Sequence, residues 1–428
     1  MTIPRVLLLT GTPPSSAGVG GIFLNDLCLS YPSESISCFA LPSFGYDTSL
    51  ENSNRFPITS VHRPTENGLL GPGRYVARLT GFPQLEYYIA GLVTLPLHQY
   101  IRNVRVPALT KHAVQFARQQ RVEIVWAILN HPTLIYLAHR VAAALHVPLV
   151  FTVWDPPERF AVELGLDSLT FRILLRDFAK TLSTAVRCSV ASEEMQIEYK
   201  KRYGIESVVL IHGIHPKLRH PAAKELAWKD RFIIGVAGSL YASREWQALL
   251  SALSSVNWRF DGRDVTVRVL GAGLSLRALG KVRVEYLGWR SVEETIDLLS
   301  QVDVTYLPYW FDERYSLSAR LCFPNKLATY LAAGRPVLFH GPEDSSPAQF
   351  FRRFPVGLCC HSLMESQIIG SLRRLATDRE LYASAAQAGQ RAQDEELNLN
   401  VFLRRFAALI GVEESELLSA RGNFHSSP

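Results

Sequence analysis

Short hydrophobic strands alternate with helical stretches almost from one end of the chain to the other. In the first half, the sequence predicts strands at 6–10, 122–129 and 148–154, with helical patterns between them. A second series begins with the hydrophobic run 231–237 and continues to the strand 337–339. Alternation of this kind predicts parallel sheets covered by helices on both faces, an α/β fold.

The length of the chain predicts two domains. A single core rarely serves 428 residues, so two domains of roughly 200 residues each are expected. The alternation stops where two prolines and several charges occur, and an interdomain linker is expected there. The predicted boundaries are an N-terminal domain at 1–212, the linker at 213–230, a C-terminal domain at 231–395, helices at 396–418 that pack back on the first domain, and a disordered tail at 419–428.

The composition narrows the classes of partner. The formal charge is +6 and the pI is near 9.0, which suits an anionic small ligand or an anionic membrane surface. Nucleic acid is not expected, because no long Lys/Arg run with interleaved aromatics occurs. Residues 71–106 are rich in aromatics and arginine. They predict either a membrane-touching or acceptor-binding insertion, or a helical pair packed on the sheet, and the helical pair is the favoured alternative.

The same sequence lacks the signals of a secreted or membrane-spanning chain. No apolar run reaches the roughly 18 residues that a spanning helix needs. The six cysteines show no zinc-ligand spacing and are sparse for the length, which predicts reduced thiols. We expect a cytoplasmic protein whose contact with the inner membrane face, if any, is peripheral.

The segment 323–338 predicts a helix followed at once by a buried strand. Pro324 suits the start of the helix and Gly334 suits the residue just past its end. Lys326 falls in the first turn, where a cation opposes the helix dipole. A bound anion would remove this conflict, so the segment predicts a phosphate site.

Four motifs carry a family resemblance: Gly20-Gly21 after the first strand, Asn130-His131-Pro132 at a strand end, Gly238-Ser239-Leu240 followed by Arg244, and Pro-Asn-Lys-Leu at 324–327. In these the chain resembles the GT-B fold glycosyltransferases. It is most similar to the large retaining nucleotide-sugar-dependent family (glycosyltransferase family 4-like), in a Pro-Asn-Lys-Leu subgroup. The resemblance implies two Rossmann-like, doubly wound domains that face each other across a cleft.

The resemblance also implies a donor site. Its expected residues are Gly20, Gly21, Ser239, Arg244, Gly288, Pro308, Tyr309, Asn325, Lys326 and Thr329. Two of them depart from the family pattern, because Ser239 stands where relatives carry an arginine and Thr329 where many carry a glutamate. Lys326 is expected to supply the charge that Ser239 lacks.

The expected catalytic residues are His131, Asp155, Asp312 and Glu313. A retaining reaction needs no protein base, because the leaving phosphate helps to deprotonate the acceptor. An inverting one needs a base, for which Asp155, Glu158 and His131 are candidates. No metal and no cofactor is expected besides the donor, a UDP- or GDP-sugar.

The implied acceptor is a sugar, a lipid-linked compound or a small molecule, and the implied product a polysaccharide, a glycolipid or a glycosylated metabolite. Two alternatives stay open. One is a nucleotide-sugar epimerase or hydrolase on the same fold. The other is a non-catalytic binding partner.

Overall fold

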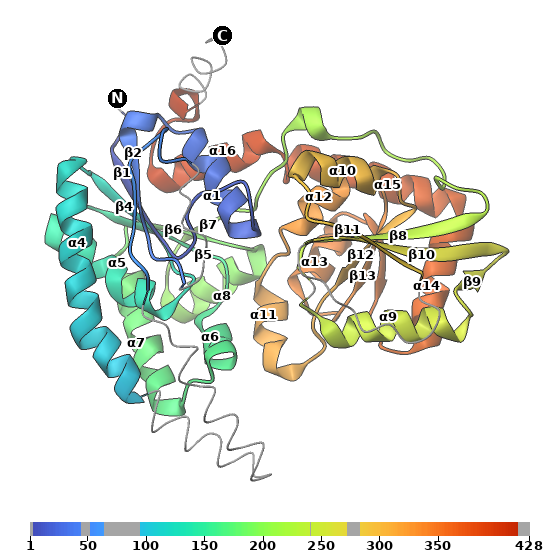
Figure 1. Ribbon diagram of the computed structural model, residues 1–428, viewed down its shortest axis with the longest axis horizontal. Helices are drawn as coiled ribbons and strands as arrows, with labels where there is room; N and C mark the ends of the chain where they lie inside the picture. Colours follow the sequence, from blue (N-terminus) through green and yellow to red (C-terminus); the bar gives the residue numbers. More distant parts are fainter. Residues whose placement is uncertain (1–2, 44–51, 64–94, 240, 272–282, 418–428) are drawn as a thin grey trace. The chain divides into compact units, whose positions relative to one another are not determined.

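The computed structural model describes residues 3–43, 52–63, 95–239, 241–271 and 283–417. The chain forms two compact units, one made of Met1–Leu210 with Leu403–Pro428 and the other of Ile211–Phe402. Each unit is a parallel sheet with helices packed on it (Figure 1). The predicted α/β class with two parallel-sheet domains is therefore confirmed.

The sheet of the first unit is entirely parallel, with the strand order β3-β2-β1-β4-β5-β6-β7. Its strands are β1 (Val6–Thr10), β2 (Ile36–Ala40), β3 (Ile58–Ser60), β4 (Ile124–Ile128), β5 (Leu149–Val153), β6 (Arg187–Val190) and β7 (Ser207–Val209). The order changes direction between β1 and β4, which are both fully buried. Loops after two such strands diverge, and ligands of doubly wound sheets bind at that point.

Helices cover both faces of this sheet (Figure 1). They are α1 (Val19–Leu29), η1 (Ser33–Ser35), η2 (Ile101–Arg105), α4 (Val106–Gln119), α5 (Pro132–Leu145), α6 (Pro157–Leu164), α7 (Ser168–Thr184) and α8 (Glu193–Tyr203). The helices α4, α5 and α7 pack next to one another. Local signals set the helix starts: the Asp167 carboxylate accepts the backbone N–H groups of Leu169 and Thr170, which caps α7.

The helix α16 (Leu399–Ile410) begins in the second unit and ends in the first. In the first unit, the Phe406 ring centroid lies 4.7 Å from that of Trp126 and 6.2 Å from that of Tyr31. The Arg187 guanidinium donates to the carbonyls of Leu409 and Ile410, at 2.7 and 2.6 Å. The end of α16 is thus part of the core of the first unit.

The sheet of the second unit has the parallel order β11-β10-β8-β12-β13-β14, and β9 pairs antiparallel with β10. Its strands are β8 (Arg231–Ala237), β9 (Arg259–Phe260), β10 (Arg263–Leu270), β11 (Val284–Gly288), β12 (Val304–Pro308), β13 (Val337–His340) and β14 (Gly357–Cys360). The strand order changes direction between β8 and β12. The loops after these two strands therefore mark the expected ligand position of this unit.

The helices of the second unit are η3 (Pro216–Leu218), α9 (Ser243–Ser255), α10 (Val292–Ser300), η4 (Glu313–Tyr315), α11 (Ser316–Leu321), α12 (Lys326–Ala332), α13 (Ser346–Arg353), α14 (Glu365–Thr377) and α15 (Arg379–Glu395). Ser291 and Glu294 form a reciprocal capping box at the start of α10. The predicted helix after Pro324 is confirmed. In the part of the chain that the structure describes, no helix is both long and apolar enough to cross a bilayer.

The stretch between the two strand–helix series packs on the second unit. The N–H of His220 donates to the Ala332 carbonyl at 2.8 Å, and that of Ala223 donates to the Gly334 carbonyl at 2.9 Å. Gly334 follows α12 with φ +70°, and a Cβ on it would lie 2.3 Å from the Pro221 carbonyl oxygen. Both its left-handed backbone and the approach of this stretch therefore require glycine.

Candidate functional site

A lysine occupies the point in the second unit where the strand order changes direction. Lys326, the first residue of α12, reaches the loop after β8. Its Nζ donates to the Ser239 carbonyl at 3.0 Å and lies 4.5 Å from the centroid of the Tyr241 ring. Gly238, which follows β8 directly, has a left-handed backbone with φ +81°. A Cβ built on Gly238 would lie 3.9 Å from both Cε and Nζ of Lys326, so the lysine side chain lies over this glycine. The ammonium therefore sits at the carboxyl end of β8.

The surroundings of Lys326 disfavour its charged form. Burial lowers the pKa of the ammonium to about 7. Within the described residues, the ammonium contacts the Ser239 carbonyl and the Tyr241 ring, and no carboxylate pairs with it. Because α12 has only seven residues, Lys326 itself and not the helix dipole supplies most of the positive charge. A half-buried cation in this setting is stabilised by a bound anion.

A second cation lies nearby on α9. Arg244 is the second residue of that helix and is exposed. The Asp312 carboxylate bonds to Arg314, and this contact lowers the pKa of Asp312, with a smaller contribution from the charge of Arg244. Glu313 is exposed on the 3₁₀ turn η4. The structure thus brings Arg244 into electrostatic contact with Asp312, and it ties Asp312 to an arginine.

A buried carboxylate that the sequence did not reveal holds the loop after β12. Glu245 is 1% exposed, and its Oε1 accepts the N–H of Phe311 at 2.7 Å. The hydroxyl of Tyr306 lies 3.0 Å from the Glu245 carbonyl and 2.7 Å from Nδ1 of His340. A glutamate in the first turn of a helix normally faces water, and its pattern therefore gave no signal. Glu245 fixes the segment that leads to Asp312.

The other expected donor residues divide into two groups. Tyr309 is 2% exposed and its hydroxyl donates to the Cys322 carbonyl at 2.7 Å, so its side chain packs the loop. Pro308 is also buried, at the end of β12. Half-buried Asn325 and Thr329 flank Lys326 on α12, and Gly288 ends β11 in an exposed turn with φ +70°. Only this second group presents surface at the carboxyl edge of the sheet.

In the first unit, Gly20 and Gly21 lie in the first turn of α1 and are tightly packed. A Cβ on Gly20 would lie 3.0 Å from the Trp154 ring, and one on Gly21 would lie 2.3 Å from the Ser15 hydroxyl. A side chain at either position would therefore displace Trp154 or Ser15. Trp154 follows β5, and its Nε1 is buried with no hydrogen-bond partner within the described residues.

His131 follows β4, at the point where the strand order changes in the first unit. It is the N-cap of α5, and its Nδ1 accepts the N–H of Thr133 at 3.2 Å. Burial, with the charge of Arg63, holds the pKa of the imidazole well below its usual range. A neutral ring that accepts at Nδ1 carries its proton on Nε2. His131 is thus built to donate a hydrogen bond.

Two carboxylates follow β5. Asp155 Oδ1 pairs with Arg159 at 2.6 Å, and Glu158 Oε1 pairs with Arg202 at 2.8 Å. Either one would have to give up its arginine to act as a base. Within the described residues, no three His, Cys, Asp or Glu side chains are grouped so that they could hold a metal ion.

Known proteins resemble the chain at two levels. Residues 231–344 match the family model described as glycosyl transferases group 1. Over the whole chain, the structure is similar to that of Anabaena HepE in complex with UDP, with a TM-score of 0.64 at 15% identity, covering 95% of this chain and 99% of that one. No curated protein sequence matches significantly.

Two further solved structures have the same fold. Sucrose-phosphate synthase of Thermosynechococcus elongatus has a TM-score of 0.64 at 14% identity, covering 99% of this chain and 100% of that one. The E. coli trehalose-6-phosphate structure, bound with UDP-2-fluoro glucose, has a TM-score of 0.61 at 12% identity, covering 95% and 99%. These likenesses establish the GT-B fold, and the family match assigns residues 231–344 to the glycosyl transferases. Residues 231–344 are a glycosyl transferases group 1 segment, and the chain as a whole has the GT-B fold.

Proposed function

We propose that the protein transfers a sugar from a UDP- or GDP-sugar to a hydroxyl acceptor, with retention and without a metal ion. The observation that carries the proposal is Lys326, a half-buried ammonium held by a carbonyl and an aromatic ring at the carboxyl end of β8. A donor diphosphate supplies the anion that this position lacks. Structural neighbours were solved with UDP and with UDP-glucose, which supports a donor of this class.

In this proposal the leaving diphosphate is stabilised by protein cations. Lys326 and Arg244 lie at the edge where phosphate groups of a nucleotide bind in doubly wound sheets. Fixed cations aimed at developing charge lower the barrier to departure, because they need no reorganisation during the reaction. The main-chain groups around Gly238 and Ser239 complete the contact, and the side chain of Ser239 takes no part.

The residues of the first unit support retention. His131 donates from Nε2, which suits a hydrogen bond to a sugar hydroxyl and does not suit proton abstraction. Asp155 and Glu158 are each paired with an arginine. With no available base among these three candidates, the leaving phosphate takes the acceptor proton. The acceptor is a sugar, a lipid-linked compound or a small molecule, and we place the enzyme in the cytoplasm with a peripheral contact to the inner membrane face.

Nucleotide release from a panel of UDP- and GDP-sugars tests this function. Release only when an acceptor is added supports transfer, and the anomeric configuration of the product then decides retention. Release or isomerisation without acceptor would support an epimerase or a hydrolase. No thermal shift with any nucleotide would favour a binding partner without catalysis. Activity that persists in excess EDTA supports transfer without a metal.

A matched pair of variants tests the role of Lys326. Lys326→Met keeps the length of the side chain and removes the charge. We expect the donor dissociation constant to rise by at least about tenfold, because a charge-assisted contact contributes about 1.5–3 kcal/mol. Lys224→Met is the control, since Lys224 is an exposed lysine in the segment 211–230 that packs near the amino ends of the strands. Unchanged donor affinity in Lys326→Met would sink the assignment.

A further inference from the structure

One layer of helices in the first unit carries a large excess of positive over negative charge. This basic layer is made of residues 95–119, 132–145 and 168–184, which include η2, α4, α5 and α7. The helices pack next to one another on the sheet (Figure 1). The layer holds eight Lys or Arg residues against one carboxylate, a formal +7, whereas the whole chain carries +6. The eight are Arg102, Arg105, Lys111, Arg118, Arg140, Arg172, Arg176 and Lys180.

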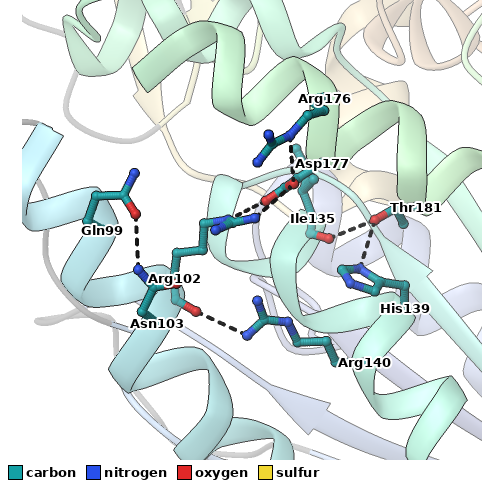
Figure 2. Close-up of polar contacts among 9 residues, drawn as sticks. All are labelled: Gln99, Arg102, Asn103, Ile135, His139, Arg140, Arg176, Asp177 and Thr181. Atoms are coloured by element: carbon teal, nitrogen blue, oxygen red, sulfur yellow. Dashed lines mark hydrogen bonds and ion pairs between the residues drawn. The ribbon is translucent and has the colours of Figure 1, made fainter. Parts of the chain in front are cut away.

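The single carboxylate of the layer is turned inward. Asp177 is 5% exposed and accepts two hydrogen bonds from Arg102, from Nε at 2.5 Å and from Nη2 at 3.2 Å (Figure 2). Arg140 donates to the Arg102 carbonyl at 3.0 Å, which ties η2 to α5 as well. This ion pair fixes η2 on α7 and uses the only negative charge of the layer in doing so. Among the outward-facing cations, Arg176 also lies 3.8 Å from the buried Asp177 carboxylate (Figure 2), so this one carboxylate offsets only a small part of the positive charge of the layer.

Three of these cations form a stripe on α7. Arg172, Arg176 and Lys180 are spaced four residues apart and are all exposed. Successive residues at this spacing share one face of a helix. Neighbouring charges of the layer influence one another: burial, Lys180 and Arg140 together lower the pKa of His139. The layer thus presents closely spaced positive charge to an anionic partner.

Apolar side chains are exposed at one end of the layer. Tyr100 and Val104 are 51% and 53% exposed, four residues apart on the helical stretch that enters α4, and Leu169 is 51% exposed in the first turn of α7. Residues 95–102 and 170–173 line one small pocket together, so the two helix starts lie side by side. The exposed apolar side chains therefore belong to neighbouring elements at the same end of the basic layer.

We propose that the basic layer docks on an anionic lipid membrane, with Tyr100, Val104 and Leu169 entering the headgroup region and the cations above it. Peripheral membrane binding needs apolar burial and positive charge together, and this layer offers both. Nucleic acid or a free phosphate would leave the exposed aliphatic side chains of Val104 and Leu169 without a role. The basic layer is thus the surface that would make the peripheral membrane contact proposed above. Docking through this layer does not depend on the transfer chemistry.

Flotation of the full chain with lipid vesicles tests the docking surface. We expect binding to vesicles of phosphatidylcholine with roughly one third phosphatidylglycerol, no binding to phosphatidylcholine alone, and release at raised salt. Arg172→Gln/Arg176→Gln/Lys180→Gln should lower the partition coefficient by about a hundredfold, since each basic residue near the surface contributes about 1 kcal/mol. The change lies outside the proposed donor and acceptor residues.

Two further variants make the test specific. Lys224→Gln/Arg373→Gln/Arg374→Gln removes the same charge from exposed positions of the second unit, and it should bind vesicles as the unaltered chain does. Tyr100→Ser/Val104→Ser should weaken binding while its salt dependence is kept.

Three results would overturn the proposal: no binding to anionic vesicles, an equal loss in both charge variants, or a preference for DNA over vesicles. Transfer to a soluble acceptor, measured in the same samples, separates a failure of docking from a failure of the proposed function.

Discussion

Donor binding should be coupled to the uptake of a proton by Lys326. Burial brings the pKa of its ammonium to about 7, so neutral and charged forms coexist near neutral pH in the free protein. A bound diphosphate favours the charged form and raises that pKa. Only the charged lysine makes the charge-assisted contact. Raising the pH through 7 therefore depletes the binding form, and donor affinity should fall as the pH rises.

The size of this effect follows from the pKa. If the bound lysine stays charged, the apparent dissociation constant is about twofold above its low-pH limit at pH 7 and about elevenfold above it at pH 8. Binding should take up about half a proton at pH 7 and about 0.9 of a proton at pH 8. Below about pH 6 both effects should vanish, because the free lysine is already charged.

Isothermal titration calorimetry measures the uptake directly. A nucleotide sugar is titrated in two buffers of different ionisation enthalpy, and the difference in heat gives the number of protons. The probe is UDP-glucose or GDP-mannose, whichever binds, because its diphosphate diester stays ionised throughout this range. Lys326→Met should abolish the uptake, and Lys224→Met should retain it. The reasoning is refuted if the unaltered chain takes up no proton at pH 8, or if Lys326→Met takes up as much.

Two more predictions concern the buried polar groups beside this site. Glu245→Ala leaves the N–H of Phe311 without a partner, which should cost about 1–3 kcal/mol of stability and weaken donor binding. Glu245→Gln keeps an acceptor oxygen and should bind the donor nearly as the unaltered chain does. Urea unfolding measures the stability of the two variants, and calorimetry measures their donor affinity. Equal stability and equal affinity of Glu245→Ala and Glu245→Gln would contradict the role of Glu245 in positioning the loop after β12. The second prediction concerns pH. Burial lowers the pKa of His340 to about 4, below its usual value near 6.5, so its contribution to stability is complete above pH 6.5 and is lost as the pH falls toward 4. By about pH 5 the loss should reach about 2 kcal/mol. Urea unfolding at pH 7 and at pH 5 should show a smaller drop for His340→Gln than for the unaltered chain, and equal drops would show that His340 is not the titrating group.

Local signals were sufficient to predict much of the fold. The serine and glutamate of the α10 capping box lie three residues apart, and the helix that ends before Gly334 shows both its start and its stop in the sequence. Such features depend on residues within one turn of each other, so a single sequence displays them. The same holds for the alternation of strands and helices that predicted two parallel sheets.

The environment of each site residue could not be predicted in this way. The packing of Gly20 against Trp154 joins residues more than one hundred positions apart. The bond from Glu245 to the N–H of Phe311 spans 66 positions, and Glu245 in a first turn looks like any solvent-facing acidic residue. Spacing rules describe one element at a time, whereas these contacts arise only when separate loops meet at the edge of a sheet.

The end of α16 has a consequence for the order in which the chain matures. The second unit is one continuous stretch, Ile211–Phe402, and it can fold as soon as that stretch has left the ribosome. The first unit cannot complete its core until residues 403–410 have been synthesised. Phe406 packs beside Trp126, and the carbonyls of Leu409 and Ile410 accept hydrogen bonds from Arg187. The domain that is synthesised first is therefore completed last. A nascent chain that stops before these residues carries a finished second unit and a first unit with an open core.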